Sequence, residues 1–150
     1  MTVINSSSFI GRPIDEVFDF GSDLRNELLW NPKVVSMDKI TDGPIGVGTR
    51  MRGQWTKSKL IDIECTQYER PSRITWVNGG PVSVDLSITF TEQDGGTRID
   101  AAFDARPNGL FKLVFPIFIR MMKKEEAANG RYLKQYLEGR DSDAASAADQ

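Results

Sequence analysis

The chain has 150 residues, a formal net charge of −2 and 39% hydrophobic residues, values that are typical of one soluble domain. A charge this small gives no strong field to attract nucleic acid or an anionic membrane, so we expect neither as a partner. The sequence contains no histidine and one cysteine, which excludes histidine-dependent catalytic triads, an intrachain disulfide and most zinc sites, and we expect no metal or other cofactor.

The first part of the chain is predicted to form one strand and two short helices. Residues 2–10 are rich in β-branched and small side chains, which favour a strand. Pro13 suits the first turn of a helix over residues 13–20, where apolar residues recur at helical spacing. Ser22 or Asp23 could cap a second short helix.

The middle of the chain is predicted to be a series of strands. Strand patterns cover residues 34–40, 47–55, 59–68, 74–76, 82–90 and 97–105. Apolar residues alternate most regularly in 82–90, and Asp94-Gly95-Gly96 is a signal for a tight hairpin before the last strand. One apolar and one polar side per strand indicates an antiparallel sheet with one buried face and one solvated face.

Residues 110–138 change to helical periodicity. An apolar arc is expected to face the sheet, and it consists of Leu110, Leu113, Val114, Ile117, Phe118, Met121, Ala128 and Tyr132. Pro116 either kinks this helix or marks the end of a short first segment. Phe115 and Ile119 lie away from the arc and indicate either a wide buried face or a dimer contact. Residues 141–150 are small, polar and acidic, and we expect a disordered tail.

These elements predict a single α+β domain with a seven-stranded antiparallel sheet and a long C-terminal helix. A long antiparallel sheet twists and curls. Wrapping it around one helix should leave a concave, mostly apolar cavity, and such cavities usually bind small molecules. We find no signal peptide pattern and no apolar stretch long enough to span a bilayer. A cytoplasmic location is therefore expected.

Several short segments together resemble the START-like, helix-grip superfamily, which is also called the polyketide cyclase/dehydrase or SRPBCC group. The segments are residues 13–18, Trp30-Asn31-Pro32, residues 43–49, residues 68–71 with Trp76, residues 94–98 and residues 133–138. The resemblance implies a START-like domain over residues 1–140 with a curved sheet gripping the C-terminal helix. Members include lipid and hormone carriers, aromatic polyketide cyclases and ring-hydroxylase subunits. The last group binds iron through histidines, which this chain lacks.

The expected ligand-binding residues come from the inner face of the sheet and the apolar arc of the helix. They are Met51, Trp55, Ile63, Cys65, Trp76, Val84, Leu86, Phe103, Leu113, Ile117, Met121 and Glu125. Trp55 and Trp76 could stack on a flat ligand, or could simply fill the core. Glu125 is the one charge within the apolar arc. It could bind a polar ligand group or act as an acid or base with a raised pKa, or it could lie hydrated at the cavity mouth.

Three functions remain open from the sequence. The first is binding of a small hydrophobic or aromatic molecule by a carrier or sensor. The second is a polyketide cyclase/dehydrase-like lyase, in which Glu125 with Tyr132 or an arginine would move protons. The third is an interaction domain without a ligand, for which a homodimer is one possibility.

Overall fold

The predicted α+β architecture is confirmed by a computed structural model, which describes the backbone of residues 2–56 and 58–148 and the side chains of residues 3–56 and 58–139. Within these ranges seven strands form one antiparallel sheet in the order β1-β7-β6-β5-β4-β3-β2. The strands are β1 Thr2–Ile10, β2 Val34–Lys39, β3 Arg50–Trp55, β4 Ile61–Glu69, β5 Arg73–Asn78, β6 Val82–Gln93 and β7 Gly96–Pro107. The first and last strands of the chain are therefore neighbours at one edge.

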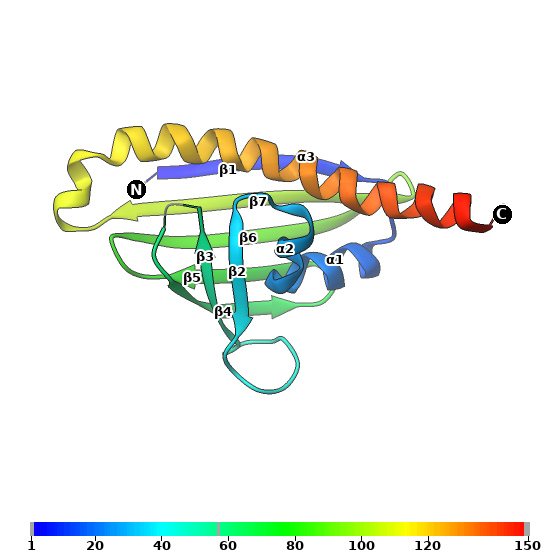
Figure 1. Cartoon of the computed structure of the whole chain (residues 1–150), viewed down its shortest axis with the longest axis horizontal. Coiled ribbons are helices and arrows are strands. Elements are labelled where there is room, and N and C mark those ends of the chain that lie inside the picture. The colour runs from blue at the N-terminus through cyan, green and yellow to red at the C-terminus, as the bar shows by residue number, and fades with distance from the viewer. Residues whose placement is uncertain (1, 57, 149–150) are drawn as a thin grey trace.

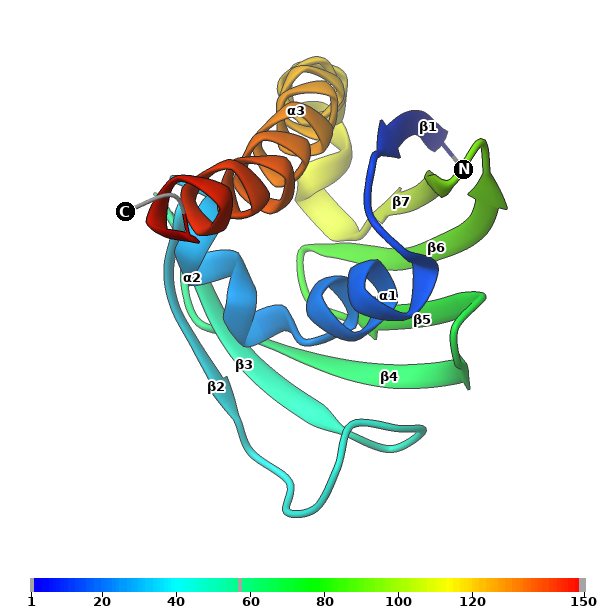
Figure 2. The ribbon, with the colours of Figure 1, turned by 90° about the vertical axis from the view of Figure 1, so that its right-hand side faces the viewer.

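Helices lie on one side of this sheet. The helices are α1 Ile14–Ser22, η1 Leu24–Asn26, α2 Glu27–Trp30, η2 Gly109–Leu113 and α3 Phe115–Ala148. Figure 1 shows α3 running along β1 and β7, and Figure 2 shows the sheet curling around α1 and α2, with α3 beside its β1 edge. The predicted tail at 141–150 lies outside the described side chains, so it stays a prediction.

The longest hairpin, β6–β7, follows from its turn residues. Gln93 pairs with Gly96, which leaves Asp94 and Gly95 as a two-residue loop with φ angles of 49° and 77°. Positive φ at both positions matches the right-handed twist of the strands and is favoured by Asp-Gly. A Cβ on Gly96 would lie 2.6 Å from the Ile10 carbonyl oxygen, so only glycine fits where β1 passes the hairpin.

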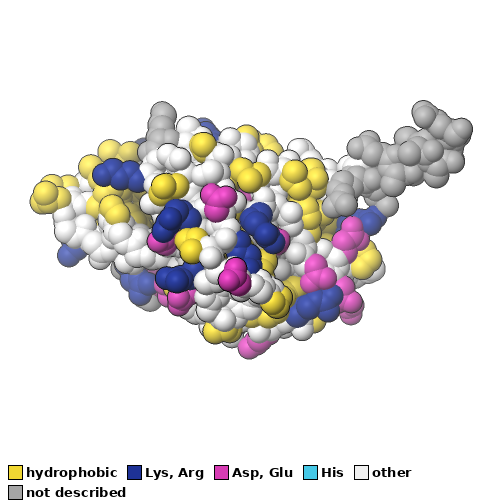
Figure 3. Space-filling view, turned by 60° about the horizontal axis from the view of Figure 1, so that its bottom comes forward, with side chains coloured by type: hydrophobic (Ala, Val, Ile, Leu, Met, Phe, Trp, Pro, Cys, Tyr) yellow, Lys and Arg dark blue, Asp and Glu magenta, His cyan; other side chains and the backbone are white. Residues whose placement is uncertain are grey.

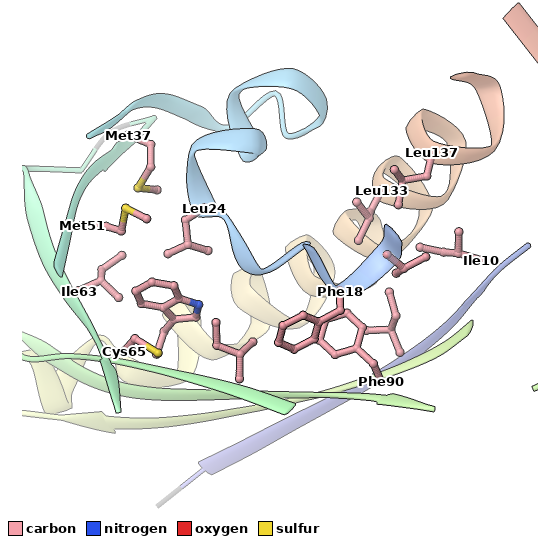
Figure 4. Close-up of a cluster of buried hydrophobic side chains, with 14 residues drawn as sticks. Ile10, Phe18, Leu24, Met37, Met51, Ile63, Cys65, Phe90, Leu133 and Leu137 are labelled. Carbon is pink, nitrogen blue, oxygen red and sulfur yellow. The ribbon is translucent and has the colours of Figure 1, made fainter. Parts of the chain in front are cut away.

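The interior is packed in two apolar clusters. The first joins α1, η1 and the end of α3 to the middle of the sheet, and it includes Ile10, Phe18, Leu24, Met51, Trp76, Phe90, Leu133 and Leu137 (Figure 4). The second joins the beginning of α3 to the other end of the sheet, and its buried members are Ile4, Val82, Val84, Ala105 and Ile119. The two clusters divide the contact surface of α3 between them.

The start of α3 settles the role of Pro116. The 3-10 helix η2 ends at Leu113 and α3 begins at Phe115, so Pro116 lies in the first turn of α3. The N–H groups of the first helical turn have no acceptor within the helix, so the missing N–H of proline does not weaken α3, and its fixed φ suits the position. Of the two alternatives for Pro116, the end of a short first segment is confirmed.

The predicted orientation of α3 is wrong. Leu110, Leu113 and Ile117 are 86%, 80% and 75% exposed, and Met121 is exposed as well. Of the predicted arc, Phe118 does pack inward, and the rest of the buried side consists of Phe115, Ile119, Met122, Leu133 and Leu137. Nearly every residue from Leu110 to Met122 is apolar, so periodicity alone could not select the buried side of the helix. Phe115 and Ile119 thus belong to the second cluster. The buried face is not the wide one expected, because most of the predicted arc is exposed.

Candidate ligand-binding site

The sheet residues expected to bind ligand all lie on the inner face. Met51, Ile63, Cys65 and Trp76 are buried in the first cluster with Trp55 packed against them, and Figure 4 shows Met51, Ile63 and Cys65 on the strands that face Leu24 of η1. The three others belong to the second cluster: Val84, Leu86 and Phe103. The sheet therefore brings these eight side chains to the surface that the helices cover.

The residues of η2 and α3 that were expected to bind ligand do not face the inner side of the sheet. Leu113, Ile117 and Met121 are exposed, and Glu125 is half-buried. The inner side of α3 instead presents Phe115, Phe118, Ile119 and Met122. Leu133 and Leu137 are the last two leucines of the helix. Counting back from them in steps of three and four residues would have identified this side.

A polar seam separates the two apolar clusters. On β1, Ser6 and Ser8 lie between Ile4 and Ile10 on the same face, because side chains alternate along a strand. On α3, the corresponding stretch between Ile119 and Leu133 contains Glu126, Asn129 and Gly130. A Cβ on Gly130 would lie 3.4 Å from the Cβ of Ser8, so the helix and strand approach closely here. We call Ser6, Ser8, Glu126, Asn129 and Gly130 the polar seam.

A crevice of about 270 Å³ reaches the polar seam from the β1 edge. It is lined by Ser6, Ser7, Ser8 and Phe9 of β1 and by Glu126, Ala127, Gly130, Arg131 and Lys134 of α3. Lys134 Nζ donates to the Phe9 carbonyl oxygen at 2.7 Å and to Glu138 Oε1 at 2.9 Å, which ties the helix to the strand at this end. A second hollow of about 330 Å³ shares Ser6 and Ser7 with the first and is also lined by Asn5, Arg73 and Thr89. Neither is the enclosed apolar cavity expected between sheet and helix.

Two carboxyl groups where α2 and α3 meet, Glu27 and Glu126, have strongly shifted pKa values. Burial, helped by the charge of Glu126, raises the pKa of Glu27 on α2 to about 7, although Asn31 hydrogen-bonds to the carboxylate and opposes the shift. Burial, helped by the charge of Glu125, raises the pKa of Glu126 to about 7. The sequence prediction chose Glu125, the neighbour of the residue that is desolvated, because the helix was rotated. Nothing in the sequence pattern singled out Glu27.

The inner face also contains one donor without an acceptor. Trp76 is 2% exposed, and its Nε1 finds no hydrogen-bond partner among the described residues. A buried indole N–H usually has a partner, and leaving a donor unsatisfied costs about 1–3 kcal/mol. Trp76 pairs with Cys65 on one side and Leu86 on the other, so this donor lies in the middle of the sheet between apolar neighbours.

Cys65 has the character of a buried apolar side chain. Burial raises the pKa of its thiol, and Sγ donates to the Gln67 carbonyl oxygen at 3.3 Å. A thiol in this state is a poor nucleophile. No group of three Cys, Asp or Glu side chains that could hold a metal ion occurs in the part of the chain that the structure describes.

Comparison with known proteins agrees with this architecture. Residues 1–138 match the family model described as polyketide cyclase / dehydrase and lipid transport. The chain belongs to this family. No curated protein is similar to this family member in sequence. No helix in the described residues is long and apolar enough to cross a membrane.

Solved structures share the fold at low sequence identity. TTHA0849 from Thermus thermophilus has a TM-score of 0.74 and 16% identity, over 89% of this chain and 95% of that one. The Aha1 dimer from Colwellia psychrerythraea has a TM-score of 0.68 and 14% identity, over 92% and 97%. The di-domain ARO/CYC BexL has a TM-score of 0.72 and 14% identity, over 89% of this chain and 49% of its own. At these identities the likeness concerns the helix-grip fold, and fold alone does not assign an activity.

Proposed function

We propose that this family member binds a small hydrophobic molecule with one polar group between the inner face of the sheet and α3, as a carrier or sensor. The observation that carries the proposal is the buried Trp76 Nε1, which has no acceptor among the described residues. An oxygen atom on a bound molecule would supply the missing acceptor and remove the cost of the unsatisfied donor.

The surroundings divide into an apolar part and a polar part. The body of the ligand would lie against Met51, Ile63 and Trp76, which are buried in the first cluster and would have to separate from their neighbours to admit it. The polar seam offers hydroxyl groups, and Glu27 and Glu126, with pKa values near 7, are partly protonated at neutral pH and can donate or accept hydrogen bonds. We therefore expect neutral ligands to bind better than anionic ones, because an anion would face carboxylates.

The family description couples polyketide cyclases and dehydrases with lipid transport. Polyketides and lipids are largely apolar molecules that carry oxygen atoms, which is consistent with an apolar surface around the Trp76 donor. The fold gives no finer assignment of the ligand.

A matched pair of probes tests the proposal. 2-Acetylnaphthalene has one acceptor oxygen, and 2-ethylnaphthalene has nearly the same shape and none. We expect the ketone to bind the protein about tenfold more tightly than the hydrocarbon, the difference made by one buried hydrogen bond. The Trp76→Phe variant should lose this preference, and the Trp55→Phe variant, altered in the same cluster, should keep it.

Fluorescence titration gives the two dissociation constants, and thermal melting shows whether each variant is folded. If neither probe binds the wild-type protein, or if wild-type protein binds both equally, Trp76 is not a contact for the ligand. The comparison of two probes on unaltered protein needs no variant to fold.

A lyase is the second candidate function, and the two raised pKa values favour it. A carboxyl group with a pKa near 7 is matched to general acid or base catalysis at neutral pH. Glu27 and Glu126 would replace the predicted Glu125 with Tyr132, since Tyr132 is exposed. The test is the rate of cyclisation or dehydration of a poly-β-ketone thioester, followed by absorbance. A rate that is zero, or one that survives both Glu27→Gln and Glu126→Gln, would remove this candidate.

A further inference from the structure

The beginning of α3 has an exposed apolar face, and its opposite face is packed against the sheet. Leu110, Leu113, Val114, Ile117 and Met121 are all exposed, and we call them the η2–α3 patch. Ile117 and Met121 are four residues apart and share one side of the helix. The other side is packed in the second cluster through Phe115, Phe118, Ile119 and Met122. Figure 3 shows hydrophobic side chains gathered at the end of the molecule where η2 leads into α3, on the left.

The charges around the η2–α3 patch are mostly basic, and the exception is Glu125, which follows Met121 by four residues on the same side of α3. Between Asp104 and Glu125 the sequence contains no acidic residue and five basic ones: Arg106, Lys112, Arg120, Lys123 and Lys124. Arg106 pairs with Asp85 at 2.8 Å. The other four form no ion pair with the described residues and are exposed. Arg120 and Lys124 follow Ile117 by three and seven residues, so they lie on the same side of α3 as the patch.

We propose that the η2–α3 patch docks on the surface of an anionic lipid bilayer. A helix with apolar side chains on one face and basic residues beside them lies in the interface, with its apolar side chains among the lipids and its cations at the headgroups. Each basic residue near an anionic membrane strengthens binding by about fivefold. The net charge of −2 predicted no membrane partner, because it averages this basic end with an acidic remainder.

The charge pattern favours a bilayer over a second copy of the chain. A symmetric dimer through the η2–α3 patch would bring the same surface of both copies together. Lys112, Arg120, Lys123 and Lys124 of one copy would then approach the same four residues of the other, and like charges across an interface disfavour association. An anionic surface meets the same residues with opposite charge. The inference does not depend on the proposed ligand, since the patch faces away from the interior.

Vesicle sedimentation with the full chain tests the docking surface. We expect the protein to sediment with vesicles of phosphatidylcholine and phosphatidylglycerol at about 3:1, to bind phosphatidylcholine vesicles at least about tenfold more weakly, and to be released by salt. Ile117→Glu should weaken binding at least about tenfold, and Lys123→Gln with Lys124→Gln about twentyfold. Val47→Glu is the matched control, because Val47 is 70% exposed on the loop between β2 and β3, far from α3 (Figure 1).

Three outcomes would overturn the proposal. One is an absence of sedimentation with the anionic vesicles. Another is equal binding by wild type and Ile117→Glu, with equal melting temperatures showing that both are folded. The third is a dimer in sedimentation equilibrium that Ile117→Glu abolishes while vesicles bind neither protein, which would assign the patch to a second copy.

Discussion

The two halves of α3 are attached to the sheet in different ways. In the second half Leu133 and Leu137 are buried in the first cluster, and Lys134 and Glu138 bond to the backbone of β1 and of Gly11. In the first half Ile119 is buried, while Ile117 and Met121 point outward. Among the residues whose side chains are described, the first half thus has large aliphatic side chains on both sides, whereas those of the second half, Leu133 and Leu137, lie on the inner side.

The two halves of α3 are therefore expected to have different roles: one stabilises the fold, and the other is available to bind a partner. Apolar residues that are buried stabilise the fold, whereas apolar residues on a supported but exposed face contribute little to folding and are available to a partner. The polar seam lies where one half gives way to the other, so the middle of α3 is the least apolar part of its contact with the sheet.

The largest expected effect contrasts one buried and one exposed side chain of α3. Leu137→Ala should lower the free energy of unfolding by about 3 kcal/mol, because Leu137 is fully buried and its truncation leaves a cavity. Ile117→Ala should change it by less than about 0.5 kcal/mol. Urea unfolding followed by circular dichroism measures both. Equal losses would show that the two halves of the helix are packed alike.

The next effect concerns the carboxyl group at the junction of the two halves. The pKa of Glu126 is raised to about 7 from its ordinary value of 4.5, so protonated Glu126 favours the folded state. Its contribution to stability is fully present below pH 4.5 and is lost as the pH rises through about 7. Glu126→Gln should remove this dependence and make the protein about 2 kcal/mol more stable at about pH 8.

Unfolding free energies of wild type and Glu126→Gln between pH 4.5 and about pH 8 measure this effect. Glu92→Gln is the control, because Glu92 is an exposed carboxylate near the end of β6 and should leave the pH profile unchanged. Parallel profiles for wild type and Glu126→Gln would mean that Glu126 is hydrated and that the junction is open to water.

The smallest expected effect tests the polar attachment of the second half. Lys134→Met removes the bond from Nζ to the Phe9 carbonyl oxygen and should cost about 1 kcal/mol. Lys123→Met, at an exposed lysine of the first half, should cost less than about 0.5 kcal/mol. Differential scanning calorimetry resolves the two melting temperatures. A melting temperature for Lys134→Met equal to that of wild type would show that this hydrogen bond does not stabilise the attachment of the second half.

The strands could be predicted from the sequence because alternation and turn residues are local signals. Asp94-Gly95 specified a two-residue turn, and the strands on either side of it therefore paired in one register. The regular alternation from Val82 to Phe90 likewise placed Val84 and Leu86 on the inner face. The predicted assignment of eight sheet residues to that face followed from these signals alone.

The orientation of α3 could not be predicted in the same way. Nearly every residue from Leu110 to Met122 is apolar, so either side of the helix could have been the buried one. Docking on β1 and β7 decided between them, and this contact depends on residues more than a hundred positions apart, such as Ser8 and Gly130. The same tertiary contact selected Glu126 over Glu125, and the packing of α2 beneath α3 brought in Glu27.

The most direct test of ligand binding in the interior is the NMR signal of the Trp76 indole N–H in ¹⁵N-labelled protein. The three tryptophans give three such signals, and Trp76→Phe identifies the one that matters. Saturating 2-acetylnaphthalene should move this signal as the ketone oxygen accepts its hydrogen bond, and 2-ethylnaphthalene should move it much less. A Trp76 signal that stays in place when the ketone is bound would contradict the account.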